Sequence, residues 1–174
     1  MSSDRFEQRL DPVRERLMRY AFALTRDRDE ARDLFQETVV RAMSATEIPV
    51  PEPAFRAWLF KIVRNLWIDR TRTHARRSHL NERFAGSHGP EAGEATTERH
   101  YEVREAFSCL TIEHQEVLAL VDIAGFSYEE TGELLSIPKG TVMSRVARAR
   151  QAMFQLLSSE AVVPLSRQRG RCER

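Results

Sequence analysis

The sequence has 174 residues, of which 41% are hydrophobic and 30% are charged, and its formal net charge is only +1. The length allows one domain or two small ones, and the charged content is typical of a soluble protein. No apolar run approaches the roughly 20 residues that a membrane-spanning helix needs. The N-terminus also lacks the apolar core of a signal peptide, so we expect a cytoplasmic protein with no membrane insertion.

Charge is distributed unevenly along the chain. Bases outnumber acids from Arg56 to Arg77 and again from Leu134 to the end, whereas acids dominate from Asn81 to Glu133. Two basic blocks separated by an acidic one suggest two sites for a polyanion, although most charge runs are solvated helix faces. The histidines and the two cysteines, Cys109 and Cys172, show no metal-binding spacing, so we expect no metal site and no disulfide framework, with Cys109 in the core.

Three amphipathic helices are predicted in the first part of the chain. The first begins at Asp11 and Pro12, which suit the N-cap and the first helical position. The second begins near Asp27, with Glu30 three residues on, as in a capping box. A segment with three prolines, from Ser44 to Pro53, interrupts the helical pattern. The third helix is expected from about Ala54 to Arg72, and the three helices can share one core.

The second part of the chain predicts a helix-turn-helix. Residues 74–97 show little periodicity and contain several Gly, Ser and Glu residues, which indicates a flexible linker. Two helices follow, and then Ser127 and Glu130 form the capping box of a short helix. A turn from Ile137 to Gly140 leads into a longer basic helix that begins at Thr141. The predicted fold is therefore all-α, with two small helical domains at 1–73 and 98–160, a flexible linker at 74–97 and a tail at 161–174.

The last helix has the character of a DNA-recognition helix. If Val142, Val146 and Ala149 are buried, helical spacing turns the opposite side outward. Arginines at the start of such a helix can read guanine in the major groove, and hydroxyls and lysines can hold phosphates. The alternative is an ordinary basic surface helix. The outward residues, with the lysine that precedes them, are Lys139, Thr141, Ser144, Arg145 and Arg148.

The third helix mixes bases and aromatics on one side. The apolar spacing assigns its core side to Phe55, Leu59, Ile62 and Leu66. The opposite side then carries Arg56, Phe60, Lys61, Arg64, Trp67, Ile68 and Thr71. Basic side chains interleaved with aromatic rings suit the binding of single-stranded nucleic acid. The cationic groups neutralise the phosphates, and the nucleobases stack on the aromatic rings. The alternative is that Phe60 and Trp67 pack on another helix or on a partner.

Three blocks of this sequence resemble the extracytoplasmic-function sigma factors of the sigma-70 family. The blocks are DEARDLFQETVVRAM, AFRAWLFKIVRNLWIDRTR and FSYEETGELLSIPKGTVMSRVARAR, in the order and spacing of that family. The resemblance runs from about residue 13 to 155, excluding the linker. One block alone is weak, since helix-turn-helix motifs occur in many regulators, but three together are specific. Met143 and Ser136 depart from the pattern, where many relatives have a lysine and a glycine.

The resemblance implies a function and a role for each block. A member of this family binds core RNA polymerase, through its beta-prime clamp and beta flap, directs it to promoter DNA, and has neither enzymatic residues nor a cofactor. The family commonly also has an anti-sigma factor as a partner. The polymerase-binding residues implied by the match are Asp33, Leu34, Gln36, Glu37 and Arg41. The third helix matches the one that opens and reads the minus-ten element. The residues implied for this role are Arg56, Lys61, Arg64, Asn65, Trp67, Asp69 and Arg70. The loop from Ser44 to Pro53 matches the one that captures a flipped base, and the last helix matches the reader of the minus-thirty-five element.

Two other functions compete with this interpretation. A stand-alone helix-turn-helix regulator explains the last helix but not the basic, aromatic third helix. An enzyme that acts on nucleic acid requires clustered carboxylates or metal ligands, whereas the acids here are spaced as on helix surfaces. We therefore expect no catalytic residues.

Overall fold

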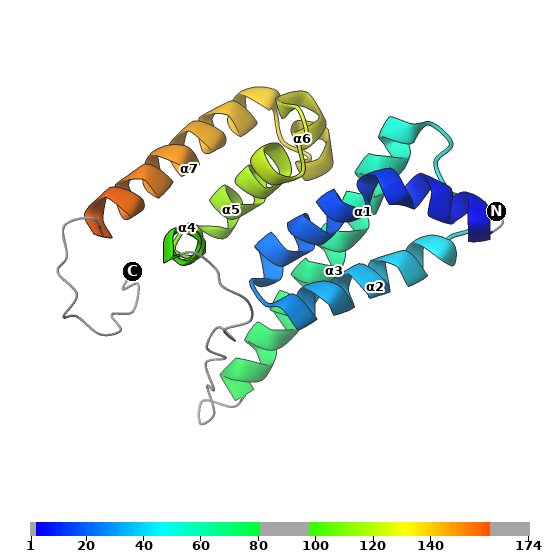
Figure 1. Ribbon diagram of the computed structural model, residues 1–174, viewed down its shortest axis with the longest axis horizontal. Helices are drawn as coiled ribbons and strands as arrows, with labels where there is room; N and C mark the ends of the chain where they lie inside the picture. Colours follow the sequence, from blue (N-terminus) through cyan, green and yellow to red (C-terminus); the bar gives the residue numbers. More distant parts are fainter. Residues whose placement is uncertain (1–2, 81–97, 161–174) are drawn as a thin grey trace. The chain divides into compact units, whose positions relative to one another are not determined.

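The computed structural model describes residues 3–80 and 98–160, with side chains described for 4–73 and 102–158. Every regular element in these ranges is a helix, and the chain divides into two compact units, Met1–Glu91 and Ala92–Arg174 (Figure 1). The prediction of an all-α fold with two helical domains is confirmed. None of the helices that the structure describes is long and apolar enough to cross a membrane.

Helix α1 spans Ser3–Thr25 and begins well before the predicted start at Asp11. Phe6 and Leu10 are each only 2% exposed, so the apolar stripe begins one to two turns upstream of Pro12. Pro12 lies inside the helix on an exposed side, where water can satisfy the carbonyl that proline cannot bond. Burial of the upstream stripe therefore outweighs the local stop signal that proline gives.

Helix α2 spans Arg28–Met43 and has the predicted N-cap. The backbone N–H of Glu30 donates to Asp27 Oδ1 at 2.8 Å. The helix buries one stripe, in which Thr38 satisfies its hydroxyl by donating to the Leu34 carbonyl at 2.7 Å. The buried residues of α2 are Ala31, Leu34, Phe35, Thr38 and Ala42.

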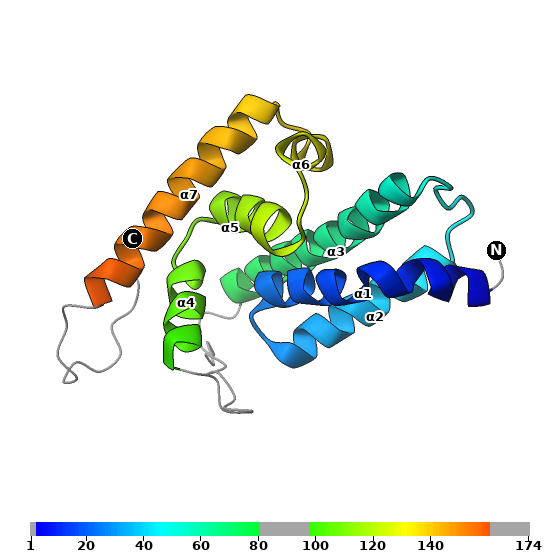
Figure 2. The same ribbon diagram turned by 45° about the horizontal axis from the view of Figure 1, so that its top comes forward.

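Helix α3 spans Glu52–Leu80 and is longer than predicted at both ends. Pro53 falls in its first turn, which proline tolerates because the N–H groups there have no helical partner. Residues 74–80, predicted as linker, are helical; they contain neither glycine nor proline, and the first glycine is Gly86. The rest of the predicted linker lies outside the described residues. In Figures 1 and 2, α1, α2 and α3 lie side by side, and each contacts the other two.

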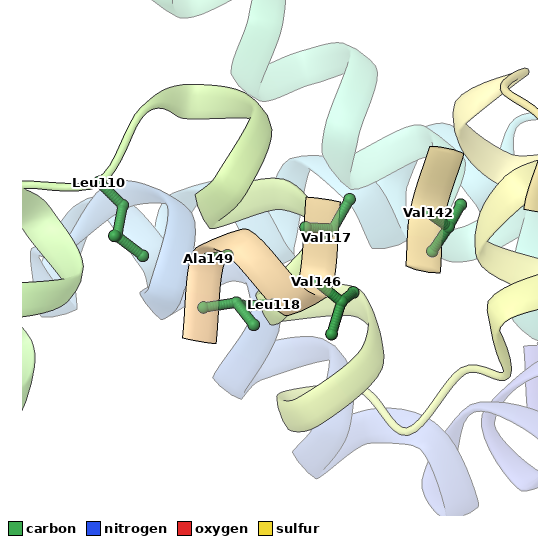
Figure 3. Close-up of a cluster of buried hydrophobic side chains, with 6 residues drawn as sticks. All are labelled: Leu110, Val117, Leu118, Val142, Val146 and Ala149. Atoms are coloured by element: carbon green, nitrogen blue, oxygen red, sulfur yellow. The ribbon is translucent and has the colours of Figure 1, made fainter. Parts of the chain in front are cut away.

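The second unit contains α4 (Glu98–Ser108), α5 (Ile112–Leu118), a π-helical turn (Ala119–Ile123), α6 (Tyr128–Leu135) and α7 (Lys139–Glu160). Helix α7 packs against α4, α5 and α6. Figure 3 shows the buried centre, to which α5 and α7 contribute most of the side chains. Its residues are Leu110, Val117, Leu118, Val142, Val146 and Ala149.

The turn between α6 and α7 differs in detail from the prediction. The capping box of α6 is confirmed, since Ser127 N–H donates to Glu130 Oε2 at 2.8 Å and Glu130 N–H donates to Ser127 Oγ at 3.2 Å. Helix α7 begins at Lys139 instead of Thr141, so Lys139 and Gly140 belong to its first turn. The left-handed residue of the turn is Ser136, with φ 57° and ψ 43°.

Gly132 is the glycine that this turn requires. The Ile137 N–H donates to the Gly132 carbonyl at 2.9 Å, and a Cβ at position 132 would lie 2.8 Å from the Ile137 carbonyl oxygen. A Cβ at Gly140, by contrast, meets nothing within 4 Å. The close approach of the chain to α6 therefore depends on Gly132, whereas Gly140 is free of such a contact.

Cys109 departs from the sequence prediction. It is half-buried and disulfide-bonded, whereas we expected a core cysteine outside any disulfide. The other cysteine of the sequence, Cys172, lies outside the described residues.

Candidate nucleic-acid interface

The outward side of α7 is the one that the sequence predicts. Val142 and Ala149 are completely buried and Val146 is 1% exposed, which turns the opposite side away from the core. Ser144 and Arg148 are exposed there, while Thr141 and Arg145 are half-buried at its edges. This side of α7 carries hydroxyls and guanidinium groups along the first three turns of the helix, and we call it the α7 basic face.

Acids of the same unit contact the bases of α7. Lys139 Nζ lies 3.4 Å from Glu129 Oε2, and both side chains are exposed, so the pair is weak and salt-sensitive. The pKa of the Glu113 carboxyl lies below its usual value, chiefly because its own backbone N–H and the Thr111 hydroxyl donate hydrogen bonds, with a smaller contribution from the charge of Arg145. Two acids of this unit, Glu129 and Glu113, therefore lie close to bases of α7.

Arg150 is held more firmly than the bases of the α7 basic face. Its two nitrogens donate to the Asp122 carboxylate at 2.6 and 3.3 Å. The hydrogen bonds and the negative charge of Asp122 raise the pKa of the Arg150 guanidinium. Asp122 lies in the π-helical turn that follows α5, so this ion pair joins the turn to the middle of α7. Arg150 therefore serves the packing of the unit.

The outward side of α3 is not the one that the sequence predicts. Phe60 is completely buried and Trp67 is 7% exposed, so neither ring offers a stacking surface. Helix α3 packs against both α1 and α2, and Phe60 contacts Tyr20 of α1 with ring centroids 5.2 Å apart. Of the predicted minus-ten residues, Arg56, Arg64 and Arg70 are half-buried. Between Phe55 and Thr73, the exposed polar residues of α3 are Lys61, Asn65, Asp69, Thr71, Arg72 and Thr73.

The polar side of α2 keeps most of the predicted polymerase-binding residues at the surface. Asp33, Gln36 and Arg41 are exposed. Leu34 is completely buried in the core of the first unit, so its side chain is not at the surface with the others. Its match to the family pattern reflects helix packing, because it belongs to the same stripe as Ala31 and Thr38.

Glu37 connects the two predicted surfaces of the first unit. Its Oε2 accepts a hydrogen bond from Arg70 of α3 at 2.7 Å, and its Oε1 lies 4.0 Å from Arg41 of α2. The Glu37 side chain is 41% exposed and that of Arg70 34% exposed. A residue assigned to polymerase thus holds a residue assigned to promoter DNA.

A pocket of about 490 Å³ lies between the start of α1 and the loop that joins α2 to α3. Arg5, Gln8 and Arg9 line it from α1, and Thr46, Ile48 and Val50 are among the loop residues on the other side. Sequence reasoning missed the α1 residues, because it began the helix at Asp11. The signal that could have found them is the apolar pair Phe6 and Leu10, which continues the helical stripe upstream.

Comparisons with known proteins identify two family regions in this chain. Residues 10–77 match the model of sigma-70 region 2, and residues 100–153 match that of sigma-70 region 4. A similar protein is the ECF RNA polymerase sigma factor EcfG of Rhodopseudomonas palustris, 34% identical over 144 residues, which cover 81% of this chain and 78% of EcfG. SigW of Bacillus subtilis, another ECF RNA polymerase sigma factor, is 28% identical over 167 residues, covering 88% and 89% of the two chains.

Two solved structures have the same fold. The sigma factor RpoE in complex with the anti-sigma factor NepR from Bartonella quintana matches with a TM-score of 0.71 and 28% identity, over 88% of this chain and 96% of RpoE. CnrH in complex with the cytosolic domain of CnrY matches with a TM-score of 0.69 and 25% identity, over 91% of each chain.

Proposed function

This chain belongs to the extracytoplasmic-function sigma factors of the sigma-70 family, and on that premise we propose which of its surfaces bind polymerase and which bind promoter DNA. As a sigma factor it directs RNA polymerase in transcription initiation, and sigma factors are not enzymes. We assign core polymerase and the minus-ten element to the first unit and the minus-thirty-five element to the second. The protein works where core polymerase is, in the cytoplasm.

The α7 basic face is the observation that best supports this assignment. Arg148 projects from the exposed side of α7 and Arg145 lies half-buried at the edge of that side, close to the start of the helix that would enter the major groove. We assign base contacts to these two arginines and phosphate contacts to Lys139, Thr141 and Ser144. Before DNA binds, Lys139 must leave Glu129, which is inexpensive for an exposed pair.

For the minus-ten element we assign the exposed side of α3. Lys61 and Asn65 lie one turn apart on this side, and Asp69 follows one turn later. Arg64 extends the basic surface at its edge, next to Lys61, whereas Arg56 and Arg70 are half-buried on the side of α3 that packs on the other helices. Trp67 supports this surface from inside the core, because its ring is nearly enclosed in the folded unit.

For polymerase we assign the polar side of α2, with Asp33, Gln36, Glu37 and Arg41 as its contacts. The contact with the beta flap is assigned to the second unit. The two similar solved structures support a further partner. The sigma factor RpoE is bound to the anti-sigma factor NepR, and CnrH is bound to the cytosolic domain of CnrY. We propose that an anti-sigma factor likewise binds this chain.

For the flipped base we assign the loop between α2 and α3. The match to the family covers Ser44 to Pro53, of which Ser44–Pro51 lie outside the helices. The pocket of about 490 Å³ beside this loop supports the assignment, because its volume is in the range of small-ligand pockets. Its wall combines apolar side chains, Ile48 and Val50, with polar ones from α1.

Transcription in vitro tests the whole proposal. The protein is added to core polymerase on a library of promoter sequences, each linked to a transcribed barcode, and the barcodes in the transcripts identify the active promoters and hence the motif. We expect transcripts only when both are present, with enriched motifs at minus ten and minus thirty-five. A stand-alone regulator gives the opposite result: specific nanomolar binding of duplex DNA by the free protein and no polymerase-dependent initiation.

A further inference from the structure

We propose that Arg9 is a positioning residue for the loop between α2 and α3, and that the start of α1 thereby forms part of the site for an unpaired nucleobase. The inference rests on the proposed function of that loop. Arg9 lies just before the matched sigma-70 region 2, which begins at residue 10. The region 2 match therefore does not include this residue.

The contacts of Arg9 fix both the loop and the start of α3. Its Nε donates to Glu52 Oε1 at 2.6 Å, and its terminal nitrogen donates to the Val50 carbonyl at 3.0 Å. Its guanidinium carbon lies 3.9 Å from the centroid of the Phe55 ring. The Arg9 side chain is only 14% exposed, whereas that of Glu52 is 66% exposed. One side chain of α1 therefore holds three points in a segment of six residues.

Only an arginine makes this set of contacts. The planar guanidinium presents its edge to a carbonyl and a carboxylate while its face lies on an aromatic ring. The ring is itself fixed, because Phe55 is completely buried and packs edge-on against Phe6 with centroids 5.7 Å apart. Lysine has a single ammonium on a flexible stem. Arg9→Lys therefore keeps the positive charge but loses the planar group that donates to the carbonyl and the carboxylate at once.

The loop has few other restraints of its own. Pro49 and Pro51 have no N–H to donate, and no backbone N–H from Thr46 to Val50 donates to a described backbone carbonyl. The Val50 side chain is 79% exposed, although its carbonyl is held by Arg9. The orientation of the apolar side chains in this loop thus depends on contacts from side chains outside it.

A positioned loop binds a base at a lower entropic cost than a mobile one. Fixing a loop in its bound conformation raises affinity because less freedom is lost on binding. The loop carries Ile48 and Val50 to one wall of the pocket, and α1 provides Gln8 and Arg5 on the other. A base in this pocket meets an apolar wall and an amide that both donates and accepts. Loss of Arg9 should therefore reduce base discrimination more than general DNA binding.

The test compares Arg9→Ala and Arg9→Lys with Arg14→Ala as a matched control. Arg14 is on the same helix and pairs with Asp11 at 3.2 Å, away from the loop. Holoenzyme is assembled with each variant, and fluorescence anisotropy gives the affinities for four single-stranded minus-ten oligonucleotides that differ only at the captured base. Order parameters of the loop amides of the free protein, from ¹⁵N relaxation, report positioning without DNA.

We expect both Arg9 variants to lower the amide order parameters of Thr46, Glu47, Ile48 and Val50. We also expect them to reduce the preference for the best base over the worst by about tenfold, as for one lost charge-assisted hydrogen bond. Binding of a minus-thirty-five duplex by the same holoenzymes should not change, and Arg14→Ala should behave as the wild type in every measurement. If Arg9→Ala loses helical content, the order parameters and base preference of Arg9→Lys decide whether Arg9 positions the loop.

Unchanged order parameters in the Arg9 variants would overturn the positioning role. Lower order parameters with unchanged base preference would overturn the link between Arg9 and base capture. A wild-type holoenzyme without any base preference would refute the proposed function of the loop, and in that case the order parameters alone still decide whether Arg9 positions it.

Discussion

Helices α3 and α7, both assigned to promoter DNA, differ in how much of their circumference is buried. In α7 the fully buried residues Val142, Val146 and Ala149 span an arc of only about 60°, at 100° per residue. In α3 the buried arc from Phe55 to Phe60 is about 140° wide by the same measure. A narrow buried stripe has one opposite side, which the spacing of apolar residues identifies. A wide buried arc contains several possible apolar stripes. The stripe of Phe55, Leu59 and Leu66 that the sequence indicated lies at one edge of this arc, so the side taken as exposed included Phe60 and Trp67, which are buried.

The largest expected effect is that of Trp67→Ala on the first unit. Because Trp67 is 7% exposed, we expect the substitution to lower the free energy of unfolding by about 3–5 kcal/mol. Thermal unfolding followed by circular dichroism measures this, with Lys61→Ala as an exposed control on the same helix. A variant with normal stability but slow promoter opening in permanganate footprinting would instead restore the sequence-based assignment of Trp67 to DNA.

The second expected effect concerns the turn before α7. A Cβ at Gly132 lies 2.8 Å from a backbone oxygen, so Gly132→Ala should destabilise the second unit by about 2–3 kcal/mol. Gly140→Ala adds the same methyl group in open space and should be neutral or slightly stabilising. Denaturant unfolding of the two variants gives the comparison. Equal stability would mean that the turn shifts at little cost.

A third effect tests the α7 basic face directly. Replacing Arg145 or Arg148 with Ala should each weaken minus-thirty-five binding by holoenzyme by about 1–3 kcal/mol, if each contacts a base edge. Arg150→Ala removes the same charge from the same helix, but Asp122 already holds that side chain, so the loss should be much smaller. Anisotropy with a labelled duplex measures all three. Normal binding by both Arg145→Ala and Arg148→Ala would show that the reading side of α7 is elsewhere.

The smallest expected effect is the coupling between α2 and α3. The Glu37–Arg70 pair is partly exposed, so a double-mutant cycle of Glu37→Gln and Arg70→Gln should give a coupling of about 0.5–1 kcal/mol in unfolding.

Asp33→Lys should weaken co-purification with core polymerase without changing stability. Glu37→Lys should weaken co-purification and also lower the stability of the first unit, because it breaks the contact with Arg70. Unchanged polymerase binding by Asp33→Lys would argue against α2 as the polymerase surface.

The sequence by itself determined the features that depend on a few neighbouring residues. The caps at Asp27 and Ser127 were predicted because each rests on hydrogen bonds between residues three apart. The outward side of α7 was predicted because its buried stripe is narrow. The family could also be identified, since three blocks of side chains match in order and spacing.

Tertiary packing decided the rest. Only the contact of α3 with both α1 and α2 shows that Phe60 and Trp67 are buried, and that Leu34 belongs to the core. Only the burial of Phe6 and Leu10 shows that α1 extends upstream of Pro12, toward the N-terminus. This extension brings Arg9 to the loop. The physical reason is that hydrogen bonds within one turn are set by local spacing, whereas burial depends on which helices approach from elsewhere in the chain.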